Sequence, residues 1–559
     1  MLALDTASAI RLDLSPVDYL MLIIYFSTVL MIGFAARRRV HSSMDFFLSG
    51  RSMPAWITGL AFVSANLGAT EILGMAANGA QIGMATLHYY LIGAVPAMVF
   101  LGLVMMPFYY GSKVRSVPEF MLRRFGKGAH LVNSISFAAS NVLIAGINLY
   151  AMALIIEAML GWPEWLAVVI SALFVLVYIV LGGLSSAIYN EVMQFFVIIA
   201  ALVPLTIVGM HRVGGWGGLT QALANTTGGK LMTHAWKGTG IGDVTNPIGA
   251  NWLAIVMGLG FVLAFGYWTT NFTEVQRAFS AKNMSAARRT PLIGAFPKLF
   301  IPFIVVVPGM IAAATVGNLF ADGTITYNEA IPKLMQMYLP QGVLGVAVTG
   351  MMASFMAGMA ANVSSFNTVF TYDIWERYIR PNMPDRYYLS AGRVVTTVGV
   401  VIGVGTAFLA AQFGNIMTYM QTLFSFFNAP LFAVFIVGIF WKRASPAGGL
   451  WGYIAGIIAP MVVWIGYLNH WSWFDYATGT AETLYGAIWS FVTAVVVTVA
   501  VSVATKPKPV AQLDGLVRGV GIINLKADQH AGDDKWYRSP AVLGFTALVL
   551  CVLLYIPFV

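Results

Sequence analysis

The segment from residue 53 to residue 83 reads MPAWITGLAFVSANLGATEILGMAANGAQIG. It is long and apolar enough to cross a bilayer, which takes about 20 residues. Its middle nevertheless holds an amide, a hydroxyl, a carboxylate and two glycines: Asn66, Gly68, Thr70, Glu71 and Gly74. Unwound backbone is tolerated at this depth only where it lines a cavity or is buried in protein. We therefore predict a helix that is interrupted at the middle of the membrane.

A second expected span, residues 250–274, has the same character. Its later part reads GLGFVLAFGYWTTNFTE, with glycines at 258, 260 and 266 ahead of Tyr267 and Trp268. Two interrupted spans in corresponding positions indicate an inverted-repeat transporter with its binding site at the midplane. Packing of helices through small residues is the alternative explanation.

The composition indicates an all-α polytopic membrane protein. The 559 residues are 59% hydrophobic and 9% charged, whereas soluble domains carry about a quarter charged residues. Apolar runs predict about 14 transmembrane helices. The expected spans are 17–36, 54–79, 83–108, 131–160, 164–182, 187–210, 250–274, 290–316, 341–376, 390–411, 414–440, 447–468, 482–503 and 539–558.

The placement of basic residues predicts the orientation. Loops expected inside the cell hold Arg37, Arg38, Arg39, Arg51, Lys113, Arg115, Arg123, Arg124, Lys127, Arg277, Lys282, Arg288, Arg289, Arg377, Arg380, Arg386, Arg393, Lys442, Arg443 and the basic segment 506–538. Loops expected outside hold only Arg11, Arg212, Lys230, Lys237 and Lys333. This asymmetry follows the positive-inside rule. It predicts an integral protein of the plasma or inner membrane with both termini outside.

The charged residues Glu71 and Lys298 lie inside expected spans, away from the ends of those spans. Charges at bilayer depth are costly, and they usually line a cavity or pair with one another. They are candidates for a substrate site. A buried structural ion pair, or a side chain that reaches the interface, is the alternative.

Other classes of function lack their signals. The sequence shows no nucleotide-binding loop, no HExxH and no paired-cysteine motif, which argues against an ATP-driven pump. The net charge of +9 follows the membrane topology and does not indicate nucleic-acid binding. A membrane enzyme acting on lipid is a remote alternative, because the seven histidines are scattered. We expect a small-molecule solute and the lipid bilayer as partners and no cofactor, and the oligomeric state is not indicated.

Six blocks of sequence are specific, and they lie in order between about residues 46 and 452. They read FFLSGRSMPAWITGLAFVSANLGATEILGM, SVPEFMLRRFG, GGLSSAIYNEVMQ, YWTTNFTEVQRAFSAKNMS followed by FPKL, SFNTVFTYDIW and IFWKRASPAGGLWG. In this series the chain resembles the solute:sodium symporter family, and within it the sodium/glucose cotransporter-like branch. The resemblance implies a LeuT-type fold, in which a ten-helix core consists of two inverted five-helix repeats.

The resemblance also implies a division of the chain. Residues 1–53 would form an N-terminal segment outside the cell and the first helix. Residues 54–441 would form the ten-helix transporter core. Residues 442–559 would form three C-terminal helices and a basic cytoplasmic loop.

A substrate site is implied at the midplane of this core. The implied substrate-binding residues are Asn66, Glu71, Tyr90, Tyr267, Trp268, Lys298 and Gln421. The implied gates are Met75 and Tyr89 on the outer side and Tyr267 on the inner side. The sequence departs from the sugar-binding pattern at three positions, Glu71, Tyr90 and Ala264. We therefore expect a sugar-like or other polyhydroxylated or organic solute, with glucose and galactose in doubt.

A sodium site is implied where the interrupted first core helix crosses the eighth. Sodium, like other hard cations, is bound by oxygen. The family's carbonyl ligands fall on Ser64, Leu67 and Ser354, so Na⁺ is expected there. Its two adjacent hydroxyls fall on Ala357 and Gly358, which have no side-chain oxygen.

Three further residues bear on this sodium site. The acid at the start of the fifth core helix, an aspartate in sodium/glucose members, is Glu191 here. Ser364 and Ser365 lie seven residues beyond the missing hydroxyls, about 10 Å along a helix, and cannot replace them. Ala357 and Gly358 also belong to a small-residue face that allows close helix packing.

The sequence thus predicts a secondary active symporter that moves a solute by alternating access. Coupling to sodium is the leading hypothesis. The alternatives are coupling to protons through Glu71 or Glu191, and transport without any ion.

Overall fold

The computed structural model describes residues 10–37, 42–226, 229–521 and 535–559. The first part of the chain forms α1 (Pro16–Arg37), α2 (Ser43–Leu48), η1 (Ser49–Arg51), α3 (Ala55–Asn66), η2 (Thr70–Gly74), α4 (Met75–Ile82), η3 (Gly83–Leu87), η4 (Tyr89–Ala94), α5 (Val95–Phe100), η5 (Leu101–Met105), α6 (Met106–Gly111), α7 (Val117–Phe125) and α8 (Lys127–Leu160). The middle part forms α9 (Glu164–Arg212), α10 (Gly215–Leu223), η6 (Gly229–Thr233), β1 (Thr239–Gly240), β2 (Asp243–Val244), η7 (Ala254–Ala264), α11 (Phe265–Thr270) and α12 (Phe272–Phe279). The last part forms α13 (Met284–Ala321), η8 (Tyr327–Glu329), α14 (Ala330–Tyr338), α15 (Val343–Val369), η9 (Phe370–Ile379), α16 (Asp385–Ala410), α17 (Ile416–Phe440), α18 (Pro446–Leu468), α19 (Gly479–Ala504), η10 (Val510–Leu513), η11 (Trp536–Arg538), α20 (Pro540–Tyr555) and η12 (Ile556–Phe558).

Long apolar helices dominate the architecture, as the sequence predicts. Within the described residues, eleven helices are long and apolar enough to cross a membrane, or thirteen when each of two bent pairs is counted as one span. A shorter apolar helix, 164–177, precedes a break at Gly183. The all-α polytopic class is confirmed, apart from the small antiparallel hairpin of β1 and β2. The number of 14 spans and the division at residues 53 and 441 stay predictions.

The expected spans 164–182 and 187–210 both lie in α9, which is broken at Gly183, at φ 55°. Only glycine adopts this conformation without strain, so two helical segments meet there. One boundary of the predicted spans is wrong. The helix after the second interrupted span begins at Met284, earlier than the expected 290, because Asn283 caps its N-terminus by accepting a hydrogen bond from the Ala286 N–H.

Both predicted interruptions are present as sharp bends. Ala55–Asn66 and Thr70–Leu87 meet at 60°, and 254–270 and 272–279 meet at 47°. Leu67, with ψ 43°, ends α3, and Asn271, with ψ 114°, separates α11 from α12.

Gly68 explains why the first bend can form next to α15. A Cβ at this position would lie 3.2 Å from the Cα of Gly358 and 2.7 Å from Asn148 Oδ1. The second distance is shorter than real Cβ contacts and the first is unusually tight, so glycine fits best where the bend approaches α15 and α8 so closely.

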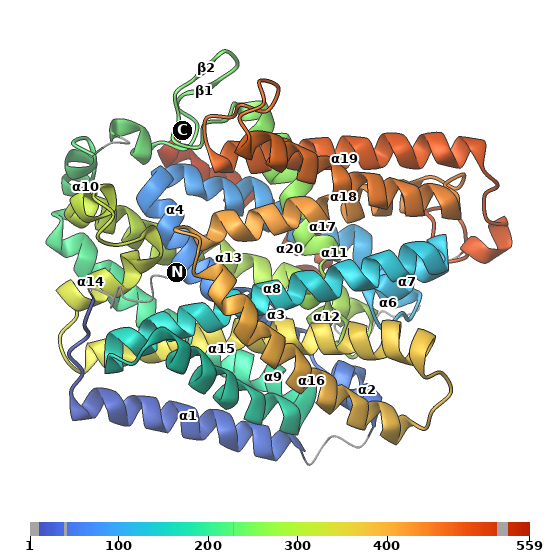
Figure 1. Ribbon diagram of the computed structural model, residues 1–559, viewed down its shortest axis with the longest axis horizontal. Helices are drawn as coiled ribbons and strands as arrows, with labels where there is room; N and C mark the ends of the chain where they lie inside the picture. The colour runs from blue at the N-terminus through green and yellow to red at the C-terminus, as the bar shows by residue number, and fades with distance from the viewer. Residues whose placement is uncertain (1–9, 38–41, 227–228, 522–534) are drawn as a thin grey trace.

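The long helices lie side by side and run in the same general direction (Figure 1). In this view α1 lies at one edge, and the packed pair α18 and α19 lies at the opposite edge. α15 packs against α3, α8 and α9, so the bend after α3 is enclosed by other helices. This enclosure is what unwound backbone requires at membrane depth.

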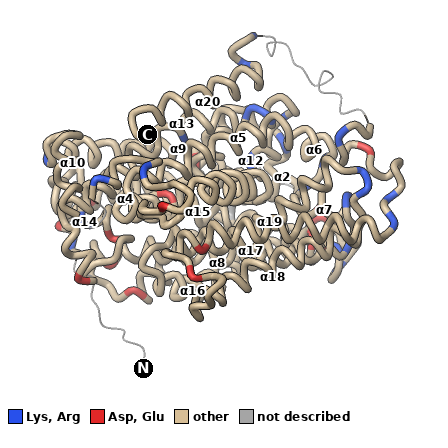
Figure 2. The backbone as a smooth tube through the Cα atoms, turned by 90° about the horizontal axis from the view of Figure 1, so that it is seen from above, with Lys and Arg blue, Asp and Glu red and all other residues tan. Residues whose placement is uncertain are grey.

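Basic residues gather most densely at the end of the molecule where α6 and α7 lie (Figure 2). This concentration agrees with the predicted inner side, although the orientation itself stays a prediction. Arg38, Arg39 and residues 522–534 of the basic segment lie outside the described residues.

Two arginines assigned to inner loops are buried in the protein instead. Arg124 donates to the carbonyls of Gly438, Trp441 and Ala444. Arg277 lies within α12 and is also fully buried. Their positive charges therefore stabilise the fold as well as the topology.

Candidate functional site

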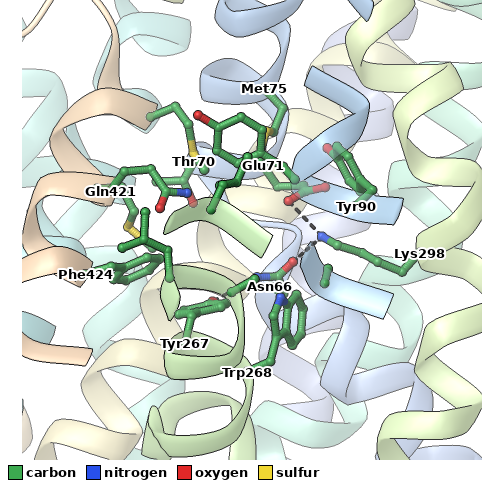
Figure 3. A pocket seen from close by; sticks show the side chains of 17 residues that line it. Asn66, Thr70, Glu71, Met75, Tyr90, Tyr267, Trp268, Lys298, Gln421 and Phe424 are labelled. Carbon is green, nitrogen blue, oxygen red and sulfur yellow. Dashed lines mark hydrogen bonds and ion pairs between the residues drawn. The ribbon is translucent and has the colours of Figure 1, made fainter. Parts of the chain in front are cut away.

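A cavity lies between the first bend, η4, the η7–α11 helix, α13 and α17 (Figure 3). Every predicted substrate and gate position lines it: Asn66, Glu71, Met75, Tyr89, Tyr90, Tyr267, Trp268, Lys298 and Gln421. The remaining lining residues are Thr70, Ala94, Leu259, Leu263, Ala264, Met417, Met420 and Phe424. Residues separated by as many as 358 positions in the chain (66 and 424) thus meet at one place.

Lys298 and Glu71 form an ion pair across one wall of the cavity. Lys298 Nζ lies 2.8 Å from Glu71 Oε2, and the side chains are 2% and 5% exposed. The ammonium group also lies 5.1 Å from the ring centroid of Tyr90 and 5.3 Å from that of Trp268. Such faces of aromatic rings stabilise a cation. The pair confirms that the two intramembrane charges meet, and it leaves this wall without net charge.

A directed series of hydrogen bonds leads away from Lys298. Its ammonium group can only donate, and it donates to Asn66 Oδ1. The amide nitrogen of Asn66 therefore donates to the Tyr267 hydroxyl, at 2.8 Å. That hydroxyl in turn donates to Glu274 Oε1, at 2.5 Å. Lys298 is thus connected to a carboxylate in α12.

The opposite wall of the cavity is aromatic and amide-bearing. The ring of Tyr267 stacks on Phe424 with centroids 4.4 Å apart, and Trp268 packs edge-on against Tyr267. Gln421 Oε1 is buried and has no hydrogen-bond partner among the described residues. A buried acceptor without a partner is costly unless a ligand satisfies it.

The predicted ion-site residues meet where α3 ends beside α15. Ser354 Oγ donates to the Leu67 carbonyl, and the Leu67 N–H donates to the Ser64 carbonyl. Two of the three carbonyls expected to bind sodium thus already accept a hydrogen bond from the protein. Ala357 and Gly358 are buried at the same crossing and bring no side-chain oxygen.

Asn148 of α8 occupies the space that the missing hydroxyls leave. Its Oδ1 accepts a hydrogen bond from the Ala69 N–H at 2.9 Å, and its amide inserts between Gly68 and Gly358. Sequence reasoning missed this residue, although an asparagine inside the apolar run 131–160 is a visible signal.

We expect Gly358→Ser, which restores one family hydroxyl, to destabilise the protein. A Cβ on Gly358 would lie 2.9 Å from Asn148 Cγ and 3.0 Å from Gly68 Cα. Overpacking of this kind costs about 1–3 kcal/mol, which thermal unfolding of the purified protein will show as a lower midpoint. Gly405→Ser in α16 is the matched control, because nothing lies within 4 Å of its Cβ position. Equal midpoints for the two variants would contradict the close packing around Asn148.

Glu191 does not join the ion-site candidates. Its carboxylate forms a two-bond ion pair with Arg277, whose Nε lies 3.2 Å from Glu191 Oε2 and whose second bond joins Nη2 to Oε1. Both side chains are 0% exposed. Glu191 is not one of the described residues that line the cavity around Lys298. Its role here is to balance a buried arginine.

Glu274 is the second residue that sequence reasoning missed. It is the last residue of the expected span 250–274. The structure buries it to 1% exposure in the first turn of α12, one hydrogen bond from the gate Tyr267.

Comparison with known proteins agrees with this architecture. The sequence model of the sodium:solute symporter family matches residues 46–456. A sodium/glucose cotransporter of Vibrio parahaemolyticus is 29% identical over 471 residues, which cover 80% of this chain and 85% of the relative. A sodium/mannose cotransporter of Bos taurus is 30% identical over 476 residues, which cover 80% of this chain and 78% of the relative.

A solved structure confirms the LeuT-type fold. It is a Na⁺-coupled sialic acid symporter in a substrate-bound outward-open state, with a TM-score of 0.73 and 18% sequence identity. The similarity covers 89% of this chain and 99% of that one. Because the family match covers most of the sequence and includes both interrupted helices, this chain belongs to the sodium:solute symporter family and is a membrane transporter rather than an enzyme.

Proposed function

We propose that the protein is a cation-coupled symporter that carries a small, uncharged, polyhydroxylated solute by alternating access. The observation that carries this proposal is the neutral Lys298–Glu71 pair in a buried cavity that also holds Gln421. A carboxylate accepts hydrogen bonds, an ammonium donates them, and an amide does both. Solute hydroxyl groups, which donate and accept, fit all three.

Charge balance favours a neutral solute over an ion. The pair already neutralises itself at 2.8 Å, so a charged solute would add an uncompensated charge to a buried site. Burying such a charge is far more costly than burying hydroxyl groups that are hydrogen-bonded. The stacked rings of Tyr267 and Phe424 supply the apolar surface that the carbon face of a sugar or polyol needs.

The relatives support this class of solute. The two relatives above are named as cotransporters of glucose and of mannose. The differences at Glu71, Tyr90 and Ala264 place other donors and acceptors around the solute, so a different pattern of hydroxyl groups is expected to be preferred.

The test is uptake by the full chain in proteoliposomes. We expect at least one of D-glucose, D-mannose and myo-inositol to be taken up faster than choline and acetate, and to accumulate under an inward sodium gradient. Faster uptake of the charged solutes would contradict the proposal. Equal uptake with and without ion gradients would favour transport without an ion.

Gln421→Ala is expected to raise the KM for the transported solute by up to about tenfold with little change in the amount of folded protein. The variant removes one neutral hydrogen bond, worth about 0.5–1.5 kcal/mol. Gln412→Ala is the control, because Gln412 is exposed and lies away from the cavity. An unchanged KM would remove Gln421 from the solute site.

A further inference from the structure

The polar centre around Tyr267 contains one more carboxylate than cation. Glu71 is paired with Lys298, and Glu191 is paired with Arg277. Glu274 is the third carboxylate, and within the part of the chain that the structure describes no Lys, Arg or His forms an ion pair with it. A buried carboxylate without a counter-charge is strongly disfavoured. A cation or a proton from outside the protein would supply the missing positive charge.

Glu274 has one free oxygen. Its Oε1 accepts the hydrogen bond from the Tyr267 hydroxyl, whereas its Oε2 is buried and has no partner among the described residues. The direction of the bonds from Lys298 through Asn66 and Tyr267 makes Glu274 an acceptor at the end of that series. Every contact of this carboxylate therefore suits its negatively charged form.

A second, smaller cavity adjoins the Glu274 side chain. Glu274 lines it together with Asn148 of α8, Asn362 of α15 and Thr273 of α12. The amide nitrogen of Asn362 donates to the Gly358 carbonyl at 2.8 Å, which leaves its Oδ1 as the free end of that side chain. Oxygen-bearing side chains from three helices thus surround one small space, which is the ligand set that a hard cation takes.

The smaller cavity is joined to the solute cavity through the inner gate. Asn66, Thr70, Tyr267 and Met420 line both. Among the described residues that line this cavity, Gly358 belongs to the sodium position implied by the family, whereas Ser64, Leu67, Ser354 and Ala357 do not appear. The cavity therefore borders that position and adds the Glu274 carboxylate, which the implied ligand set lacks.

We propose that this cavity takes up one monovalent cation, with the Glu274 carboxylate as its charged ligand, and that the cation acts on the solute gate through Tyr267. The bound cation supplies the missing positive charge. It binds the same carboxylate that accepts the hydrogen bond from the Tyr267 hydroxyl. Binding of the cation and movement of the gate are therefore linked by one group. The ligand of this cavity carries a single positive charge, which Na⁺ or a proton can supply. The effect of the cation on the gate rests on the proposed function.

The first arm of the test measures binding of ²²Na⁺ to the purified full chain without solute, by scintillation proximity. We expect Glu274→Gln, which keeps the shape and removes the charge, to weaken binding at least tenfold. Glu482→Gln is the matched control, because Glu482 is also a buried glutamate but lies in α19, away from both cavities. Unchanged binding by Glu274→Gln would overturn the proposal.

The second arm identifies a proton as the cation. If the wild-type protein binds no ²²Na⁺, proteoliposomes loaded with pyranine are expected to show solute-driven proton uptake that Glu274→Gln abolishes and Glu482→Gln retains. The same proton flux in Glu274→Gln, or no cation dependence of either kind in the wild-type protein, would overturn the proposal.

Two further measurements keep the outcomes separate. If Glu274→Gln does not fold, Asn362→Leu removes another oxygen of the same cavity and is expected to weaken cation binding at least fivefold, and unchanged binding would overturn the proposal. Exchange of labelled D-glucose, D-mannose and myo-inositol without an ion gradient tests the proposed function alone. If the wild-type protein exchanges none of the three solutes, the proposed class of solute is wrong. Binding of ²²Na⁺ would still decide the role of Glu274.

Discussion

Replacing Lys298 by methionine is expected to abolish solute uptake and to lower the free energy of unfolding by about 3–5 kcal/mol. The substitution leaves the Glu71 carboxylate buried at 5% exposure without its counter-charge, and removing one partner of a buried ion pair costs about this much. It also takes away the donor that fixes Asn66 and, through it, the Tyr267 hydroxyl. Unfolding of the purified protein in mixed micelles and uptake in proteoliposomes measure the two effects.

The double variant Glu71→Gln/Lys298→Met separates stability from transport. Removing both charges is expected to restore most of the stability, because a well-packed neutral replacement of a buried pair is often neutral or stabilising. Transport is expected to stay lost, because the groups that bind solute are gone. Lys282→Met is the control, since Lys282 is exposed at the turn between α12 and α13. Full uptake by the double variant would mean that the pair is purely structural.

Replacing Arg277 by methionine is expected to cost about 3–5 kcal/mol as well. The guanidinium group is fully buried, and beyond the two bonds to Glu191 it donates to the Thr273 carbonyl and to Gln276 Oε1. The variant leaves Glu191 charged and unpaired in the interior. The measurement is the same unfolding in mixed micelles, and Arg380→Met, at an exposed position, is the control.

The Arg277 result also bears on proton coupling through Glu191. A carboxylate that carries protons during transport has to lose its partner in each cycle, whereas one that balances a buried arginine does not. We therefore expect Glu191→Asp, which keeps the charge, to retain cation-dependent uptake. Loss of cation dependence in a folded Glu191→Asp protein would return Glu191 to the coupling mechanism.

Most of the solute site could be predicted because its residues carry local signals. Glu71 and Lys298 stand out in apolar runs, because charged groups at membrane depth are costly and usually line a cavity or pair. Gly68 stands out because glycine weakens a helix. The resemblance then assigned Gln421 and Tyr267, which have no unusual local pattern. All of these residues line one cavity, except Gly68, which lies in the bend beside it.

The ion site could be predicted less well, for two reasons. Asn148 is an ordinary polar residue in a helix, and only the close approach of Gly68 and Gly358 shows what space it fills. Arg277 looked like an inner-loop charge, because a basic residue after a span is typical of the positive-inside pattern. Its burial depends on Glu191, which lies 86 residues earlier in the chain.

The sequence by itself determined that this is a polytopic helical membrane protein with two interrupted helices, because hydropathy, glycine and intramembrane charge are properties of single segments. Only the tertiary structure decided which charges cancel. Ion pairing depends on atoms a few ångströms apart on helices that are distant in sequence. A carboxylate with an ion-pair partner balances a buried charge, whereas one without a partner is free to bind a cation. Among the three described carboxylates around Tyr267, Glu71 meets Lys298 and Glu191 meets Arg277, so Glu274 remains without an ion-pair partner.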